Sequence, residues 1–144
     1  MIRSIKQALD LLLFHLKEKG YTVVSTRATN FGRHYIIEAK HWNKPKKYRF
    51  YLAFQREWFI KMPQAFKNAN AVGATLNREI LNKLYKEGYD LIIFAHSTGF
   101  YAITPEEMYS LVLENNWIRK SQKTGEETAH IPISYLSPLK VRGV

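Results

Sequence analysis

The sequence predicts one α/β domain, with a mixed β-sheet at its centre and helices on its faces. The chain has 144 residues, of which 46% are hydrophobic, and this is enough for a single hydrophobic core. Helical and β-rich segments alternate along it, as they do in α/β domains. Residues 91–95 form an uninterrupted apolar run, which is typical of a strand buried on both faces. We find no repeat or linker, so a single domain over residues 1–144 is expected.

The first third of the chain is predicted to form a helix and three strands. Apolar side chains at helical spacing predict a helix over residues 4–19, with Ser4 as its N-cap and Gly20 as its stop. β-branched and aromatic residues then predict strands over residues 21–26, 33–40 and 47–54. The short link at residues 43–46, which includes Pro45, joins the last two strands as a hairpin.

The middle of the chain is predicted to be helical. Residues 55–74 are expected to form a short helix that Pro63 interrupts, followed by a loop. A complete helix is expected over residues 75–87, before Gly88. Its inward-facing residues are expected to be Leu76, Ile80, Leu84 and Tyr85.

The last helix has the clearest start signal in the chain. Thr104 is the expected N-cap, Pro105 takes the first helical position, and Glu107 completes a capping box. This helix is expected to end near Asn116. Further strands are predicted over residues 91–96, 100–103, 117–120 and 128–133, the last two paired around a turn at residues 124–125.

The positive charge of the chain is concentrated in its first part. Residues 1–50 contain 11 Lys and Arg against three acidic residues, a net charge of +8 out of a total of +10. Such a field attracts polyanions, nucleic acid before an acidic membrane surface. The alternative is a lysine-rich surface that serves only solubility. We expect nucleic acid, whether DNA or RNA, as the partner, and no membrane.

Basic and aromatic residues gather around the predicted hairpin. Lys and Arg contact phosphates, and an exposed aromatic ring can stack on an accessible base. Trp42, next to the turn, is the expected stacking residue, whereas Tyr48 alternates with Phe50 and Leu52 and is expected to be half-buried. The alternative role of the charges is to protect a sheet edge. The expected nucleic-acid-binding residues are Arg27, Arg33, Trp42, Lys44, Lys46, Lys47 and Arg49.

Glu38 and Lys40 could carry chemistry, because residues two apart on a strand share a face. A carboxylate that holds a divalent metal and a lysine that stabilises charge are what metal-dependent phosphodiester hydrolysis uses. An ordinary ion pair at a strand end is the alternative. With the order of elements over residues 4–103, this Glu-Ala-Lys motif resembles the PD-(D/E)XK nuclease superfamily, which includes archaeal Holliday junction resolvases. The resemblance implies a restriction-endonuclease-like fold, Mg²⁺ or Mn²⁺, a DNA substrate, Glu38 as metal ligand, and Glu38 and Lys40 as catalytic residues.

The acidic residues depart from that family's pattern. The family places a further Asp or Glu before the motif, but no acid lies between Gly20 and Ile37. Hard cations favour several oxygen ligands. Either the site is degenerate and the domain only binds DNA, or a remote acid completes it. The candidates for that acid are Asp10, Glu57 and Asp90.

Other classes of function find no support in the sequence. The absence of cysteine excludes disulfides and thiolate chemistry, the five histidines lack metal-ligand spacing, and there is no glycine-rich phosphate loop or other sign of an organic cofactor. No apolar stretch reaches the roughly 20 residues of a membrane span, and no signal peptide is recognisable, so a cytoplasmic protein is expected. A homodimer is compatible with the sequence. The remaining alternatives are a DNA-binding adaptor whose C-terminal part, from Thr104 onward, binds protein, and a module for an acidic protein partner.

Overall fold

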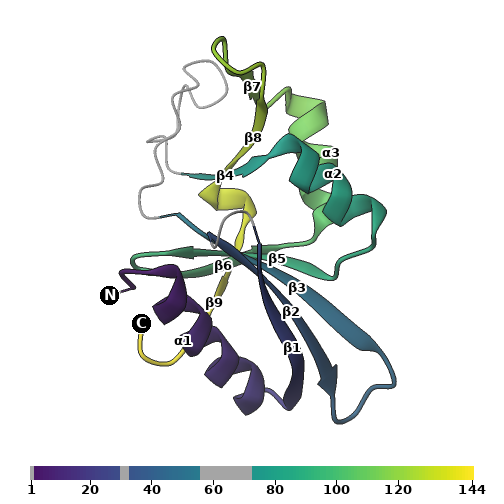
Figure 1. Ribbon diagram of the computed structural model, residues 1–144, viewed down its shortest axis with the longest axis vertical. Coiled ribbons are helices and arrows are strands. Elements are labelled where there is room, and N and C mark those ends of the chain that lie inside the picture. The colour runs from purple at the N-terminus through teal and green to yellow at the C-terminus, as the bar shows by residue number, and fades with distance from the viewer. Residues whose placement is uncertain (1, 30–32, 56–72) are drawn as a thin grey trace.

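The structure is a computed structural model that describes residues 2–29, 33–55 and 73–144. Its centre is a mixed six-stranded sheet, and a second sheet of three strands lies beside it (Figure 1). The elements are α1 (Ile5–Glu18), β1 (Tyr21–Thr29), β2 (His34–His41), β3 (Lys47–Phe54), β4 (Gly73–Asn77), α2 (Arg78–Lys86), β5 (Leu91–His96), β6 (Gly99–Ile103), α3 (Pro105–Asn115), β7 (Ile118–Lys120), β8 (Glu127–Pro132), the 3₁₀ turn η1 (Ile133–Tyr135) and β9 (Ser137–Leu139).

The large sheet has the strand order β1-β2-β3-β5-β6-β9. The first three strands form an antiparallel meander. β5 then pairs in parallel with β3, and β6 and β9 continue the sheet in antiparallel fashion. The small sheet has the order β4-β8-β7. A parallel pair requires a crossover connection, and α2 lies on the one that joins β3 to β5.

Two hydrophobic cores lie on opposite faces of the large sheet. On one face, Leu9, Leu12 and Leu16 of α1 pack against Phe50, Ile93 and other residues of the strands. On the other face, α2, α3 and the small sheet enclose a core. β5 contributes to both, with Ile92 and Phe94 on the second face and Ile93 and Ala95 on the first. This strand is therefore buried on both faces, as its apolar run predicts.

Local capping signals are realised as expected. The Ser4 hydroxyl accepts from the backbone N–H of Gln7 at 3.1 Å, and Thr104 accepts from Glu107 N–H at 3.1 Å. α1 ends before Gly20, whose φ of +91° is accessible to glycine and strained for other residues. α3 ends at Asn115, and its C-cap, Asn116, is also left-handed.

The predicted fold class is confirmed, because the chain is a single domain with a mixed sheet flanked by helices. The likeness to restriction endonucleases stays a prediction. Within the residues described, no helix has both the length and the apolar composition needed to span a bilayer.

Two details of the prediction are wrong. Residues 75–77 belong to β4 and not to a helix, because Leu76 pairs with Ala129 of β8 and Asn77 then caps α2 by accepting from Ile80 N–H. Tyr85 is exposed and does not face inward. The segment 55–74 falls largely outside the described residues.

Candidate nucleic-acid interface

The face of β1, β2 and early β3 that points away from α1 is polar and largely exposed. Directly paired residues of antiparallel strands share a face, so the register defines rows across these strands. The rows are Thr22–Lys40–Lys47, Ser25–Glu38–Arg49 and Arg27–Ile36–Tyr51. Tyr51 is buried and Ile36 packs against the core that α2, α3 and the small sheet enclose. The third row therefore marks the edge of that core. We call the residues Arg27, Glu38, Lys40, Lys47 and Arg49 the open face.

Glu38 occupies the middle of the open face, where its carboxylate has two protein partners. Its Oε2 lies 2.6 Å from Lys47 Nζ, and its Oε1 accepts from the Ser25 hydroxyl at 3.2 Å. The hydrogen bond from Lys47 is the main cause that holds the pKa of Glu38 below its usual value. Lys40 shares the face, as predicted, and no ion pair of Lys40 is found among the described residues. The carboxylate of Glu38 thus pairs with Lys47 and not with Lys40.

The surroundings of Glu38 do not fit a divalent metal ion. Ser25, and not a second acid, stands directly opposite on β1, and the Lys47 ammonium group contacts the other carboxylate oxygen. Hard cations are held by several oxygen ligands. In the described part of the chain, no group of three or more His, Asp or Glu side chains could hold a metal.

The remote acids proposed from the sequence have other contacts. Asp10 pairs with Lys6 at 3.2 Å on the exposed surface of α1, across the sheet from the open face. Asp90 accepts from Lys46 Nζ and, at 2.8 Å, from the backbone N–H of Arg49. Glu57 lies outside the described residues. Asp10 and Asp90 therefore pair with other groups and not with Glu38, and only Asp90 joins separate segments of the chain.

Two of the predicted phosphate-binding residues attach the hairpin to the loop before β5. The Arg49 guanidinium lies 4.5 Å from the centre of the Tyr89 ring and donates to the carbonyl of Glu87. Lys46 pairs with Asp90 and also lies 5.0 Å from the centre of the Tyr48 ring. Lys46 and Arg49 thus attach the hairpin to residues 87–90. The sequence does not reveal these contacts, because no regular spacing along the chain connects Tyr89 or Asp90 to the hairpin.

Trp42 is 79% exposed at the end of the β2–β3 hairpin. Its backbone N–H donates to the carbonyl of Gly20, and its ring stacks on His41 with 5.9 Å between centres. His41 is in turn fixed by Lys19 O at 3.0 Å and by the N–H of Asn43 at 3.2 Å. A large aromatic ring is thus held in place by His41 and the Gly20 carbonyl and is exposed to solvent.

The remaining predicted cations are exposed and carry no ion pair in the described structure. Arg27 projects from the edge strand β1, Arg33 precedes β2, and Lys44 lies in the hairpin turn. With the cations described above they make seven positive charges, against the two carboxylates of Glu38 and Asp90. The region keeps a net charge of +5, and its freest cations are Arg27, Arg33, Lys40 and Lys44.

A buried pair at the inner end of the open face was also missed. His34 Nδ1 and the Tyr51 hydroxyl are 2.5 Å apart on adjacent strands. Burial is the main cause that lowers the pKa of His34 to about 4, and Arg33 adds to it. His34 is therefore neutral at physiological pH and contributes no charge to the face.

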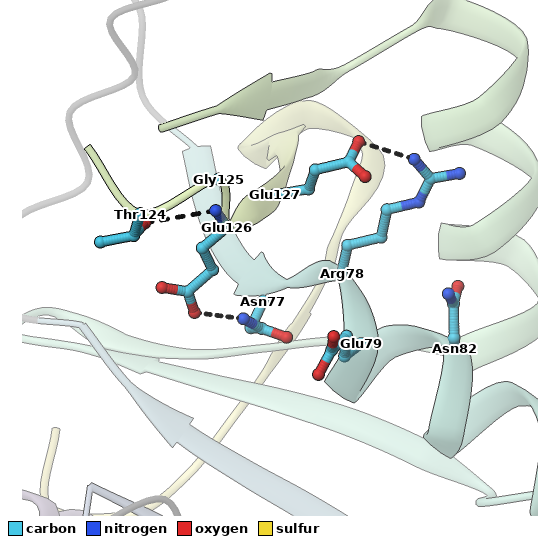
Figure 2. A pocket seen from close by; sticks show the side chains of 8 residues that line it. All are labelled: Asn77, Arg78, Glu79, Asn82, Thr124, Gly125, Glu126 and Glu127. Atoms are coloured by element: carbon cyan, nitrogen blue, oxygen red, sulfur yellow. Dashed lines mark hydrogen bonds and ion pairs between the residues drawn. The ribbon is translucent and has the colours of Figure 1, made fainter. Parts of the chain in front are cut away.

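A pocket at the far end of the molecule carries the opposite charge. A pocket of about 590 Å³ lies between α2 and the β7–β8 turn. Figure 2 shows the side chains of Glu79, Glu126 and Glu127 around it, together with that of Arg78. Glu127 pairs with Arg78 at 2.8 Å, and Glu126 accepts from the Asn77 side chain. These contacts fasten the turn to the start of α2. A polyanion would avoid this pocket and favour the hairpin.

Comparison of the chain with models of known protein families, with curated proteins and with solved structures found no match. The function must therefore be argued from the residues themselves.

Gly20→Ala is expected to displace the Trp42 ring. A Cβ at position 20 would lie 2.4 Å from Trp42 Cδ1, and the left-handed backbone adds a strain of roughly 1–2 kcal/mol. The indole N–H signal of Trp42 should shift in NMR spectra. Gly125→Ala is the matched control, because its φ of +73° gives similar strain while no atom of the described chain lies within 4 Å of the added Cβ. An unmoved Trp42 signal in Gly20→Ala would show that the ring does not rest on Gly20.

Proposed function

We propose that the protein binds DNA with accessible bases, through the open face and the adjoining hairpin turn. The observation that carries this proposal is the exposed Trp42 ring beside cations that the fold does not neutralise. Exposed aromatics stack on bases of any type, and unpaired Lys and Arg follow the backbone phosphates. Binding of this kind tolerates many sequences and falls steeply with salt.

The shape of the site favours single-stranded or branched DNA over plain duplex. The candidate surface consists of strands and a turn, and none of the described helices projects from it toward a major groove (Figure 1). Stacking on Trp42 requires a base that has left the duplex stack. An acidic protein partner would meet the same charges, but it would gain nothing from an exposed indole beyond ordinary burial. Competition by DNA at moderate salt distinguishes the two partners.

A nuclease activity is the further proposal that the resemblance of the sequence suggests. The Glu38–Lys47 ion pair supports binding without hydrolysis, because the carboxylate is held by a cation and a hydroxyl. We therefore assign Glu38 the role of pairing with Lys47 in the free protein. Incubation of branched and single-stranded DNA with the protein and Mg²⁺ or Mn²⁺ tests the nuclease proposal directly.

Replacing Arg27, Lys40 and Lys44 with Gln should weaken DNA binding and flatten its salt dependence. Removing one phosphate interaction with a single strand should reduce the slope of log K against log salt by roughly 0.7. Titrations by fluorescence anisotropy at several salt concentrations give both quantities. The control replaces Lys17, Lys83 and Lys86, which changes the net charge equally on other surfaces. Equal effects in the two triple variants would mean that only the total charge matters.

Trp42→Ala should reduce affinity for single-stranded and branched DNA more than for duplex. Stacking contributes about 1–3 kcal/mol per base, and only where bases are accessible. Circular dichroism of the variant checks that the hairpin still folds, and Trp42→Phe should restore part of the affinity. A uniform decrease on all three DNA forms would contradict the stacking role.

Glu38→Gln should strengthen DNA binding by several-fold. The change removes a negative charge from the centre of the open face and releases Lys47 to bind phosphate, so the salt slope should also rise. Ser25→Ala is the control, since it removes one hydrogen bond to Glu38 and leaves the charges unchanged. Weaker binding of DNA would contradict this prediction. If the unmodified protein shows metal-dependent cleavage and the variant does not, Glu38 is a metal ligand.

A further inference from the structure

The small sheet contains a buried histidine whose hydrogen-bonding atoms are not used. His130 is 7% exposed, and neither of its ring nitrogens has a hydrogen-bond partner among the described residues. Burial and the nearby Arg119 lower its pKa to about 4, so the ring is neutral and offers one donor and one acceptor. Buried polar groups in native proteins are nearly always paired. His130 therefore needs an explanation that the packing of the sheet does not supply.

The register of the small sheet places His130 beside other polar side chains. Ala129 and Ile131 point into the core with α2 and α3, so His130 and Thr128 point to the opposite face. Arg119 pairs directly with Thr128 and shares that face. The influence of Arg119 on the pKa of His130 agrees with this proximity.

A cavity of about 580 Å³ opens on this face of the small sheet. Among the described residues that line it, three are cations, none is acidic, and the others are polar. They are Arg119, Lys120, Ser121, Gln122, Lys123, Thr128 and His130. The volume lies within the usual range for small-ligand sites. Its positive lining contrasts with the acidic pocket on the other side of the same turn.

We propose that this cavity binds the phosphate group of a phosphate monoester, with Arg119 and Lys123 supplying charge and His130 supplying a neutral N–H donor. A guanidinium and a hydroxyl match phosphate oxygens in geometry, and Thr128 provides that hydroxyl. The terminal torsion of histidine is soft, so the ring can turn a nitrogen toward the ligand. The phosphate belongs either to a small metabolite or to a nucleic-acid end, and both present the same dianion.

The site is tested by titrating inorganic phosphate into the full chain while NMR follows the ring signals of His130. Saturable shifts are expected, and Arg119→Gln should weaken phosphate binding roughly tenfold, the usual effect of removing one charge-assisted hydrogen bond. Lys123→Gln, at an exposed position, should act in the same direction. Lys86→Gln is the matched control, because Lys86 is exposed on α2 and does not line the cavity.

Chloride at equal ionic strength separates specific binding from screening. If chloride produces the same His130 shifts, or if Arg119→Gln and Lys123→Gln bind phosphate as the unmodified protein does, the proposal is overturned. Two oligonucleotides that differ only in a 5′-phosphate then identify the source. Tighter binding of the phosphorylated strand that Arg119→Gln abolishes assigns a nucleic-acid end, whereas phosphate binding without this difference assigns a small phosphate ester. In the variant with Arg27, Lys40 and Lys44 replaced by Gln, phosphate should still shift the His130 signals. A failure of the DNA-binding proposal is therefore distinguishable from a failure of this one.

Discussion

The double burial of β5 is the constraint on which the rest of the structure depends. Its side chains alternate between two cores, with Phe94 toward α2 and α3 and Ile93 toward α1. A slip of one residue would exchange these sides, so the register of β3 against β5 is strongly specified, and the meander of β1, β2 and β3 follows from it. On one face of the large sheet, the core that α2, α3 and the small sheet enclose ends near Tyr51 and Ile36. Beyond this boundary the same register presents Glu38, Lys40 and their neighbours to solvent, and the candidate interface is the uncovered continuation of a well-packed sheet.

Local signals in the sequence predict most of the fold, and long-range contacts decide the rest. The caps at Ser4 and Thr104 and the strand over residues 47–54 depend on adjacent residues, and they appear as expected. Residues 75–77 have an apolar spacing that suits a helix equally well. Their strand partner is β8, far along the chain, and pairing with Ala129 decides their conformation. The pairing of β7 with β8 was predicted from the turn between them, and it is found. The third strand of that sheet, β4, and the strand β9 were not predicted, since short strands have little periodicity of their own.

The candidate site was predictable in its composition but not in the use of its charges. Counting Lys and Arg identifies the hairpin, and the turn signals place Trp42 at its tip, where it is indeed exposed. The count does not distinguish a cation that holds the fold from one that faces a ligand. Lys46 and Arg49 clasp the loop at residues 87–90, and Lys47 pairs with Glu38. These partners come from other strands and loops, so the sequence alone could not assign them. The same limitation concealed His130, whose unused nitrogens become evident only when the small sheet is assembled.

The Glu38–Lys47 ion pair has a consequence for the thermodynamics of binding. The hydrogen bond from Lys47 holds the pKa of Glu38 low in the free protein. If a phosphate draws Lys47 away, the carboxylate is left without this donor and gains a negative neighbour, so its pKa must rise. Protons are then taken up when the complex forms. By linkage, affinity should increase as the pH falls through the range in which Glu38 titrates. The ion pair would thus make the affinity for an anionic polymer depend on pH, and no histidine would take part in this dependence.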